Sequence, residues 1–233
     1  MPNINVLLVD DHNIVRQGLK ALLTAEGDIS VLAEAQTGRE AVNLAAQVRP
    51  DVVIMDLAMP LLNGWEATRQ ILKAVPTAKI VILSSYDSDE HIEQAISAGA
   101  TAYLIKQTAA ADLAKAIREV KKGNAYFSPA IAQRLREKTC SSLTGASQPR
   151  PANPELTFRE AEVLQLIAEG FANKQIAAEL GAAEGTIKQH RGRVMVKMKA
   201  DSLADLTLMA DRLGVRLSGT DFWKAKGRTH EMH

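Results

Sequence analysis

The sequence predicts a doubly wound α/β domain with a five-stranded, mostly parallel sheet, followed by a small all-α domain of four helices. Between residues 4 and 122, short apolar runs rich in β-branched residues alternate five times with helical segments. This pattern is followed by a stretch rich in Ser, Pro, Ala and Gly, residues 139–154. The sequence after that stretch shows helical patterns only. These two observations define both the fold class and the domain organisation.

Composition limits the class of protein. The 233 residues are 46% hydrophobic and 24% charged, which is typical of soluble globular proteins and leaves room for two small domains. The single cysteine, Cys140, excludes an intramolecular disulfide and a multi-cysteine metal site, and it fits a reducing compartment. No basic leader precedes the first strand and no apolar run approaches about 18 residues. We therefore expect a cytoplasmic protein with no membrane contact.

The central strand of the first domain lies in VVIMDLAMP, residues 52–60. Four apolar residues in succession indicate a strand buried on both faces, as in parallel α/β sheets. Asp56 follows this strand directly. Ligands of open α/β sheets bind outside the carboxyl ends of the strands, so Asp56 is a candidate site residue, although a helix-capping or turn aspartate is common at such junctions.

The other strand and helix units repeat this arrangement. The first strand leads through His12 and Asn13 into a helix with an apolar face formed by Ile14, Gly18, Ala21, Leu22 and Ala25. Apolar positions on the next three helices include Ala41 and Leu44, then Ile71 and Leu72, then Ile92, Ala95 and Ile96, and a fifth helix runs from about Asp112 to Lys122. The predicted strands are residues 4–9, 29–35, 52–55, 79–83 and 101–105.

The strand ends carry a consistent set of polar residues, namely Asp10, Asp11, Asp56, Ser84 and Lys106. Three converging carboxylates repel one another unless a cation lies among them. With only oxygen ligands expected, and no histidine or cysteine nearby, Mg²⁺ or Mn²⁺ is favoured over zinc. A lysine and a hydroxyl at the same edge would suit a phosphoryl group bound to that ion.

These motifs, in this order and spacing, make residues 4–122 resemble the flavodoxin-like receiver domain of two-component response regulators. The resemblance implies that a sensor histidine kinase phosphorylates Asp56, and that Ser84 and Tyr103 form a switch with Lys106 as the phosphate partner. Gln107 departs from the Pro or Asp frequent in this subgroup, which leaves the last loop open. Mg²⁺ would be bound by Asp11, Asp56 and the backbone carbonyl of Ala58, with Asp10 acting through water.

We predict a receiver domain over residues 1–125 and a linker over residues 126–154. Ser128 and Pro129 suit the start of a short helix that ends at about Lys138. Residues 139–154 have no apolar period and are expected to form a flexible tether. A DNA-binding domain is predicted over residues 155–215, and a polar, basic tail over residues 216–233.

The second domain begins with a capping box. Thr157 and Glu160 have the residue types and spacing that close the first turn of a helix, and Gly170 is suited to end it. Gly181 then turns the chain between two further helices, which makes a helix-turn-helix. The remaining predicted helices are residues 173–180, 184–199 and 202–213, the last burying Leu203, Leu206, Ala210 and Leu213.

The third of these helices has one buried and one basic face. A helical wheel places Ile187, Val194 and Met198 inward, while Lys188, Gln189, Gly192 and Val196 face outward with Arg193 beside them. Residues 188–199 hold five Lys or Arg and no Asp or Glu. A basic helix face is commonly just solvated, but after a helix-turn-helix turn it favours DNA binding.

Residues 156–200 resemble the LuxR-type DNA-binding domain, and the whole chain resembles response regulators of the NarL/FixJ type. The resemblance implies phosphate contacts from the second helix and major-groove contacts from the third. Ala183 departs from the serine that commonly caps the recognition helix in this family. The implied DNA-binding residues are Asn173, Lys174, Thr186, Lys188, Gln189, His190, Gly192, Arg193 and Lys197, with His190 in packing or at a phosphate.

We therefore expect a transcription regulator, not an enzyme, that dimerises when phosphorylated and binds paired DNA half-sites. Leu208 lies opposite the buried stripe of the fourth helix and suits a dimer contact. Two enzymatic alternatives are a flavin site and an aspartyl phosphatase. The strand-end loops lack a phosphate cradle for the first, and the acids come from two strands rather than one for the second. A third alternative is a regulator whose receiver dimerises or binds a partner without phosphate.

Overall fold

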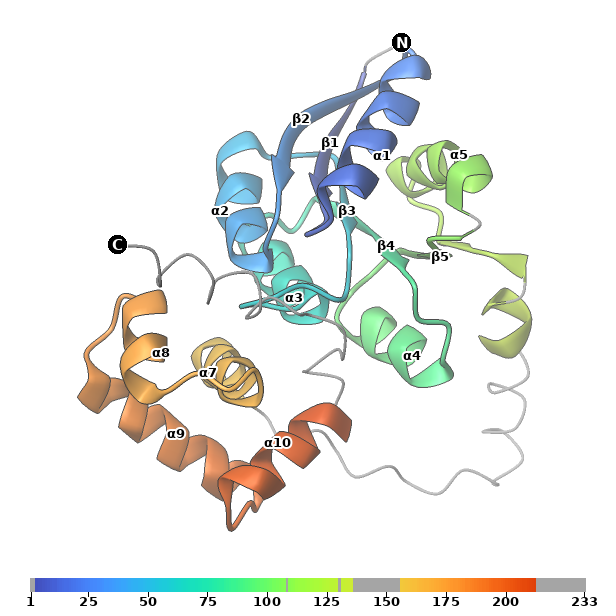
Figure 1. The fold of residues 1–233 in the computed structure, drawn as a ribbon. Helices are drawn as coiled ribbons and strands as arrows, with labels where there is room; N and C mark the ends of the chain where they lie inside the picture. Colours follow the sequence, from blue (N-terminus) through green and yellow to red (C-terminus); the bar gives the residue numbers. More distant parts are fainter. Residues whose placement is uncertain (1–2, 108, 130, 136–155, 213–233) are drawn as a thin grey trace. The chain divides into compact units, whose positions relative to one another are not determined.

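In the computed structural model the chain forms two compact units. The structure describes residues 3–107, 109–129, 131–135 and 156–212 (Figure 1). The first unit is built on a β-sheet with flanking helices, and the second consists of helices.

The sheet of the first unit has six strands in the order β2-β1-β3-β4-β5-β6, and every neighbouring pair is parallel. This order, in which the chain starts inside the sheet and winds toward both edges, confirms the predicted doubly wound α/β fold. The strands are β1 (Ile4–Val9), β2 (Ile29–Ala35), β3 (Val52–Met55), β4 (Lys79–Ser84), β5 (Ala102–Ile105) and β6 (Tyr126–Phe127).

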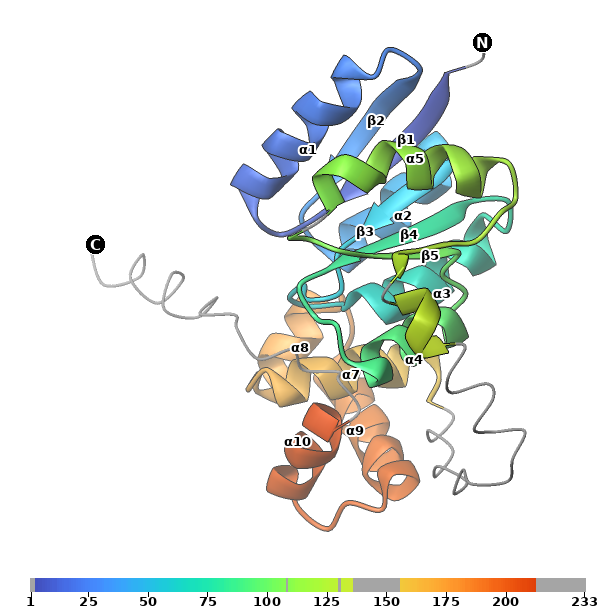
Figure 2. The same ribbon diagram turned by 90° about the vertical axis from the view of Figure 1, so that its right-hand side faces the viewer.

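Apolar side chains on both faces of the sheet hold the helices in place. Val6 and Leu8 of β1 point to one face, where they pack with Leu23 and Ile117 from the helices α1 and α5. α2, α3 and α4 cover the other face (Figure 2). The helices are α1 (Asn13–Ala25), α2 (Gly38–Val48), α3 (Gly64–Ala74), α4 (Asp89–Ser97) and α5 (Ala109–Lys121).

The prediction of five strands was one too few. Tyr126 and Phe127 form β6, which pairs with Ala102 and Tyr103 of β5 at the edge of the sheet. A two-residue strand is too short to show the alternation by which strands are recognised in a sequence, and it was therefore assigned to the linker.

The predicted apolar face of α1 was also wrong, except at Leu22, which is half-buried and packs against the core. Ile14 is 88% exposed, and Gly18, Ala21 and Ala25 are exposed as well. Leu23 and Arg16 are the buried residues of this helix. The buried face of α1 includes an arginine, a residue type that is mostly exposed in proteins, so a search for apolar spacing does not reveal this face.

The second unit contains the four predicted helices. Thr157 accepts a hydrogen bond from the backbone nitrogen of Glu160, and the Glu160 side chain accepts one from the backbone of Thr157, which confirms the capping box. Gly181 has φ of +59°, as a tight turn between helices requires. The helices are α7 (Phe158–Ala168), α8 (Asn173–Glu179), α9 (Glu184–Met198) and α10 (Leu203–Arg212).

The core of this unit forms where the inward faces of the four helices meet. The predicted inward residues of α9, Ile187, Val194 and Met198, are all buried. On α10, Leu206 is buried as predicted, but Leu203 is 44% exposed, so its predicted burial is wrong. Leu203 is the first residue of α10, and the inward face of the helix begins one turn later.

Some predictions fall outside the described residues. These are the tether at residues 139–154, the tail at residues 216–233, Leu213, and the end of the linker helix after residue 135. Residues 131–135 are helical, as predicted. Within the described part of the chain, no helix has the length and apolar character needed to span a membrane.

Gly64, the first residue of α3, allows the helix to start directly against the end of β3. A Cβ atom built on Gly64 would overlap the carbonyl oxygen of Asp56 and press on the backbone of Leu57. We predict that Gly64→Ala lowers the free energy of unfolding by about 1–3 kcal/mol, because strand-end backbone must shift. The measurement is chemical unfolding of the full chain in urea.

Gly18→Ala is the matched control, since Gly18 lies in α1 with no atom near the added Cβ. This change should instead raise the free energy of unfolding by roughly 0.5–1 kcal/mol, the usual cost of a helical glycine. Equal effects of the two changes would contradict the close contact between Gly64 and Asp56.

Candidate functional site

The carboxyl ends of two neighbouring strands carry the acidic residues of the site. Asp10 and Asp11 follow β1, and Asp56 follows β3, which pairs with β1 in parallel. The ladder continues past the strand ends, because the backbone nitrogen of Asp56 donates to the carbonyl oxygen of Val9 at 3.0 Å. The parallel pairing therefore places the predicted carboxylates side by side.

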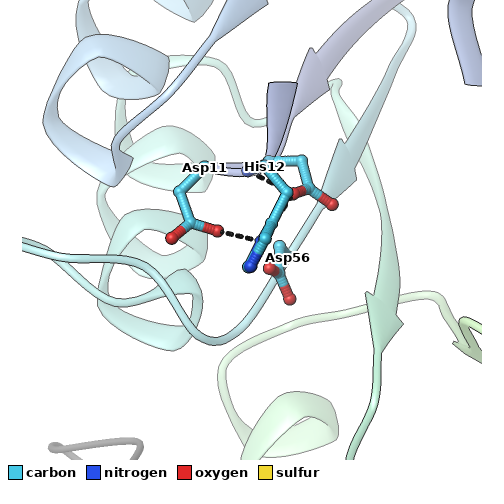
Figure 3. Close-up of side chains that lie close together, drawn as sticks. Asp11, His12 and Asp56 are labelled. Carbon is cyan, nitrogen blue, oxygen red and sulfur yellow. Dashed lines mark hydrogen bonds and ion pairs between the residues drawn. The ribbon is translucent and has the colours of Figure 1, made fainter. Parts of the chain in front are cut away.

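The side chains converge as well. One ligand atom from each of Asp10, Asp11, His12 and Asp56 lies within 4.8 Å of the others. Figure 3 shows Asp11, His12 and Asp56 gathered beyond the ends of the strands. Asp10 and Asp56 are only 1% and 2% exposed, so these carboxylates are almost completely removed from water.

Lys106, at the end of β5, completes this group. Its Nζ atom lies 2.7 Å from Oδ2 of Asp56 and 2.8 Å from Oδ2 of Asp10. Its backbone nitrogen donates to the carbonyl oxygen of Ser84 at 2.8 Å, which fixes the position of the lysine relative to β4. The structure thus brings together four residues that the sequence predicted from three different strand ends.

Burial and mutual repulsion disturb the ionisation of these groups. Burial raises the pKa of Asp56 to about 6; Lys106 opposes this rise, while Asp10 and Asp11 add to it. Burial also raises the pKa of Asp11. For Lys106, burial alone would lower the pKa, but the charges of Asp56 and Asp10 outweigh it and the pKa is raised. One lysine does not compensate three carboxylates.

Two buried oxygens test whether a metal ion would fit. Oδ2 of Asp10 is a buried oxygen 2.8 Å from Nζ of Lys106, and Oδ1 of Asp11 is a buried oxygen 2.7 Å from Nδ1 of His12. Lys106 also serves Asp56, so one lysine is shared between two buried carboxylates, and such closely spaced carboxylate oxygens are suited to a hard divalent cation. The donor set therefore fits Mg²⁺ or Mn²⁺.

The expectation that no histidine lies near these oxygens is wrong. Nδ1 of His12 is 2.7 Å from Oδ1 of Asp11, and the backbone nitrogen of His12 donates to Oδ1 of Asp10 at 2.8 Å. The side chain of His12 is 66% exposed. The sequence showed His12 only as the residue that leads into α1, and its adjacency to Asp11 was the signal that could have identified it.

Ser84 and Tyr103 both contact the loop that follows β4. Oγ of Ser84 accepts a hydrogen bond from the backbone nitrogen of Tyr86 at 3.1 Å. The hydroxyl of Tyr103 donates to the carbonyl oxygen of Tyr86 at 2.6 Å. Tyr103 is 1% exposed, and burial raises its pKa to about 12, so it remains a neutral donor. Ser84 and Tyr103, both predicted site residues, thus bind the backbone nitrogen and the backbone carbonyl oxygen of the same residue, Tyr86.

In the second unit, the outward face of α9 carries the predicted basic residues. Lys188, Gln189, Gly192 and Arg193 are exposed, and Lys188 pairs with Glu184 of the same helix at 3.0 Å. Val196 is 78% exposed on this helix. α9 therefore presents a basic surface to solvent.

The other predicted DNA-binding residues lie in more varied surroundings. Lys197 pairs with Glu160, the capping residue of α7, at 2.7 Å. His190 is half-buried, and its Nδ1 has no hydrogen-bond partner among the residues that the structure describes. Lys174 near the start of α8 and Thr186 on α9 are exposed, whereas Asn173, the first residue of α8, is half-buried.

Comparison with known families agrees with this division of the chain. Residues 6–118 match the response regulator receiver domain, and residues 154–210 match the luxR family of bacterial regulatory proteins. LiaR of Bacillus subtilis, a transcriptional regulatory protein, is 40% identical over 209 residues, which cover 90% of this chain and 97% of LiaR. The chain belongs to the two-component response regulators. Its LuxR-type domain identifies it as a DNA-binding transcription regulator.

Other relatives of this response regulator are similar along most of their length. VraR of Staphylococcus aureus is 34% identical over 207 residues, covering 89% of this chain and 96% of VraR. RcsB of Salmonella enterica, bound to promoter rprA in the presence of phosphomimetic BeF₃⁻, is 27% identical with a TM-score of 0.55, covering 89% of this chain and 98% of RcsB. A second structure shows two RcsB dimers bound to two parallel DNAs.

The raised pKa of Asp56 predicts how the stability of the response regulator depends on pH in the absence of metal. Between about pH 4 and pH 6, folded Asp56 keeps a proton that the unfolded chain has lost, so the free energy of unfolding falls as pH rises through this window. A shift of this size corresponds to roughly 3 kcal/mol. Asp56→Asn should therefore become more stable than wild type, by that order, between pH 4 and pH 7.5.

The measurement is urea unfolding of both proteins with a chelator at the two pH values. Addition of Mg²⁺ at pH 7.5 should stabilise the wild type more than Asp56→Asn. The difference between their free energies of unfolding should therefore become smaller. A stability difference that is the same at both pH values would contradict the raised pKa.

Proposed function

We propose that this response regulator is phosphorylated on Asp56 with Mg²⁺ bound beside it, and that phosphorylation promotes dimerisation and binding to paired DNA half-sites. The observation that supports this most directly is that Asp10, Asp11 and Asp56 converge, with Lys106 close to two of them. Carboxylates that repel one another around a single lysine favour a site that takes up a cation together with an anionic group.

The Mg²⁺ ion would be held by Asp11, Asp56 and the backbone carbonyl of Ala58, with Asp10 acting through water. When bound, it would neutralise charge on the carboxylates and on the incoming phosphoryl group. The buried oxygens of Asp10 and Asp11 that face Lys106 and His12 are the part of the site that suits this ion. The neighbouring His12 is exposed and would remain at the edge of the site.

Phosphoryl transfer requires an ionised Asp56. A carboxylate oxygen of Asp56 forms a new bond to phosphorus as the bond from phosphorus to the donor breaks, and the donor leaves with that electron pair. Lys106, 2.7 Å from Asp56, is in position to donate to an oxygen of the transferred group. The donor in the cell would be a phosphorylated histidine of a sensor kinase, as is typical of the family.

Ser84 and Tyr103 would link this event to the rest of the receiver. Oγ of Ser84 accepts a hydrogen bond from the backbone nitrogen of Tyr86, and the same hydroxyl could donate its proton to a phosphoryl oxygen on Asp56. Turning the hydroxyl toward that oxygen would weaken its contact with Tyr86. The loop at Tyr86 would then move, together with the hydrogen bond from Tyr103. This loop leads directly into α4, so the surface of the receiver changes where a partner can bind.

In the DNA-binding domain, we propose that α9 enters the major groove. Lys188, Gln189 and Arg193 are exposed on it, and α8 places Lys174 where it would contact phosphate. The RcsB dimers on DNA support a two-fold arrangement on paired half-sites. Leu208, 58% exposed on α10, is an apolar residue available for the contact between two such domains.

The test of the proposed function is phosphorylation by a small phosphodonor with Mg²⁺, read by mass spectrometry, followed by DNA titration. Wild type should gain one phosphoryl group and bind DNA more tightly, and Asp56→Asn should do neither. Glu26→Gln is the matched control, because Glu26 is an exposed carboxylate at the far end of α1, outside the acidic cluster and outside the loop at Tyr86.

Labelling of Asp56→Asn to the wild-type level would exclude Asp56 as the acceptor. DNA binding that is equally tight for wild type and Asp56→Asn, with and without the donor, would instead favour a receiver that acts without phosphate.

Gly192 provides a separate prediction for the DNA-binding surface. An added Cβ at Gly192 meets no atom of the chain, so Gly192→Ala should raise the free energy of unfolding by roughly 0.5–1 kcal/mol. It should nevertheless weaken specific DNA binding, because the methyl group would stand between α9 and the groove. Lys188→Ala should weaken binding with little effect on stability, since Lys188 is exposed.

The measurements are melting curves and titrations of an operator found by mapping genomic binding sites, all at one salt concentration. Gly18→Ala, the glycine change in α1, should increase stability without altering operator affinity. A more stable Gly192→Ala protein that binds the operator as tightly as wild type would show that the glycine has no role at DNA.

A further inference from the structure

Arg16 is a buried arginine on α1 that lies beside the acidic site. It is 5% exposed, and all three of its nitrogens make hydrogen bonds. Nη1 donates to the backbone carbonyl of Asp10 at 2.8 Å, Nη2 to Oδ1 of Asn13 at 3.0 Å, and Nε to Oε2 of Glu34 at 3.2 Å. Burying a guanidinium is unfavourable unless its donors are satisfied, and here each has a different acceptor.

These acceptors connect the acidic loop to the sheet. The carbonyl of Asp10 belongs to the peptide unit between Asp10 and Asp11, so the hydrogen bond from Arg16 fixes the backbone from which both carboxylates project. Glu34 lies on β2, and its pKa is lowered by Lys20 and then by Arg16, so it is ionised at neutral pH. Arg16 therefore ties the loop after β1 to a charged residue of the neighbouring strand.

The start of α1 gives an independent reason why the loop depends on Arg16. His12 occupies the N-cap position, but its side chain makes no capping hydrogen bond, and the first turn holds no acidic residue. Capping side chains are the usual means by which the chain entering a helix is held. At this helix the guanidinium of Arg16, one turn further along, binds the incoming backbone instead.

We propose that Arg16 is a positioning residue for the metal site, and that the affinity of the receiver for Mg²⁺ depends on its three hydrogen bonds through the backbone of Asp10. This inference rests on the proposed function, in which Asp10 and Asp11 serve the ion. Lysine would keep the charge but lacks the planar fork that reaches three acceptors, so Arg16→Lys separates geometry from charge. Groups that orient metal ligands typically change metal affinity 10–100-fold when mutated.

The experiment is calorimetric titration of Mg²⁺ into the unphosphorylated full chain, well below the melting temperature of each variant. We expect Arg16→Lys to raise the dissociation constant about tenfold. Lys20→Met is the matched control, because Lys20 binds the same Glu34 at 2.6 Å from an exposed position without touching the acidic loop. It should leave the dissociation constant within about twofold of wild type.

Asp11→Asn separates failure of this inference from failure of the proposed function. If Asp11→Asn abolishes Mg²⁺ binding while Arg16→Lys binds as tightly as wild type, Arg16 only stabilises the packing of α1 and the inference is overturned. If Asp11→Asn also binds as wild type does, the metal site itself is misplaced and the proposed function fails.

Glu34→Gln keeps the inference testable if Arg16→Lys does not fold. This change leaves the arginine in place and weakens the anchor of its Nε atom. It also weakens the contact of Lys20 with Glu34, which Lys20→Met removes by itself. The expected result is a weaker Mg²⁺ affinity than that of the Lys20→Met protein. Equal affinities of Glu34→Gln and Lys20→Met would count against the role of Arg16.

Discussion

The burial of two carboxylates around one lysine, with a third carboxylate beside them, is the constraint on which the receiver depends. Asp10 and Asp56 are almost inaccessible to water, and Lys106 lies within 2.8 Å of both. Carboxylates that are shielded from water and lie close to one another are unfavourable in their ionised form, as the raised pKa of Asp56 indicates. Only a rigid scaffold can hold them there, and it is provided by apolar parallel strands whose ladder extends to the backbone of Asp56. The fold thus maintains a local arrangement that an added cation would relieve.

Much of this site could be predicted from the sequence because parallel strands impose it. Each acid directly follows an apolar run, and parallel strands in one sheet end at the same edge, so their proximity followed from the pattern alone. Arg16 could not be found in this way. Its role depends on Glu34, a partner eighteen positions away on the neighbouring strand, and a burial rule that ranks arginine as exposed selects the opposite face of α1. The two residues of β6 were missed because a strand of this length is too short to show the alternation of apolar and polar residues.

The DNA-binding domain was predictable for a different reason, namely that most of its signals are local in the sequence. The contact that was not predicted is again one between residues far apart in the sequence. Capping boxes and helical apolar stripes are local, so the bounds of α7 and the inward residues of α9 followed from short stretches of sequence. The pairing of Lys197 with Glu160 is not local, since it joins α9 to the capping residue of α7. A lysine that the sequence places with the DNA-binding residues therefore also supports the start of another helix. Its charge would be shared between the two roles.

Energies of similar size at Asp56 and at the loop after β4 explain how one could control the other. The backbone of Tyr86 donates one hydrogen bond to Ser84 and accepts another from Tyr103. Each contributes about 0.5–1.5 kcal/mol to stability, which gives roughly 1–3 kcal/mol for the pair. The unfavourable ionisation of Asp56 amounts to roughly 3 kcal/mol. Since about 1.4 kcal/mol changes an equilibrium tenfold, an event at Asp56 that removed one of these hydrogen bonds would shift the position of this loop severalfold.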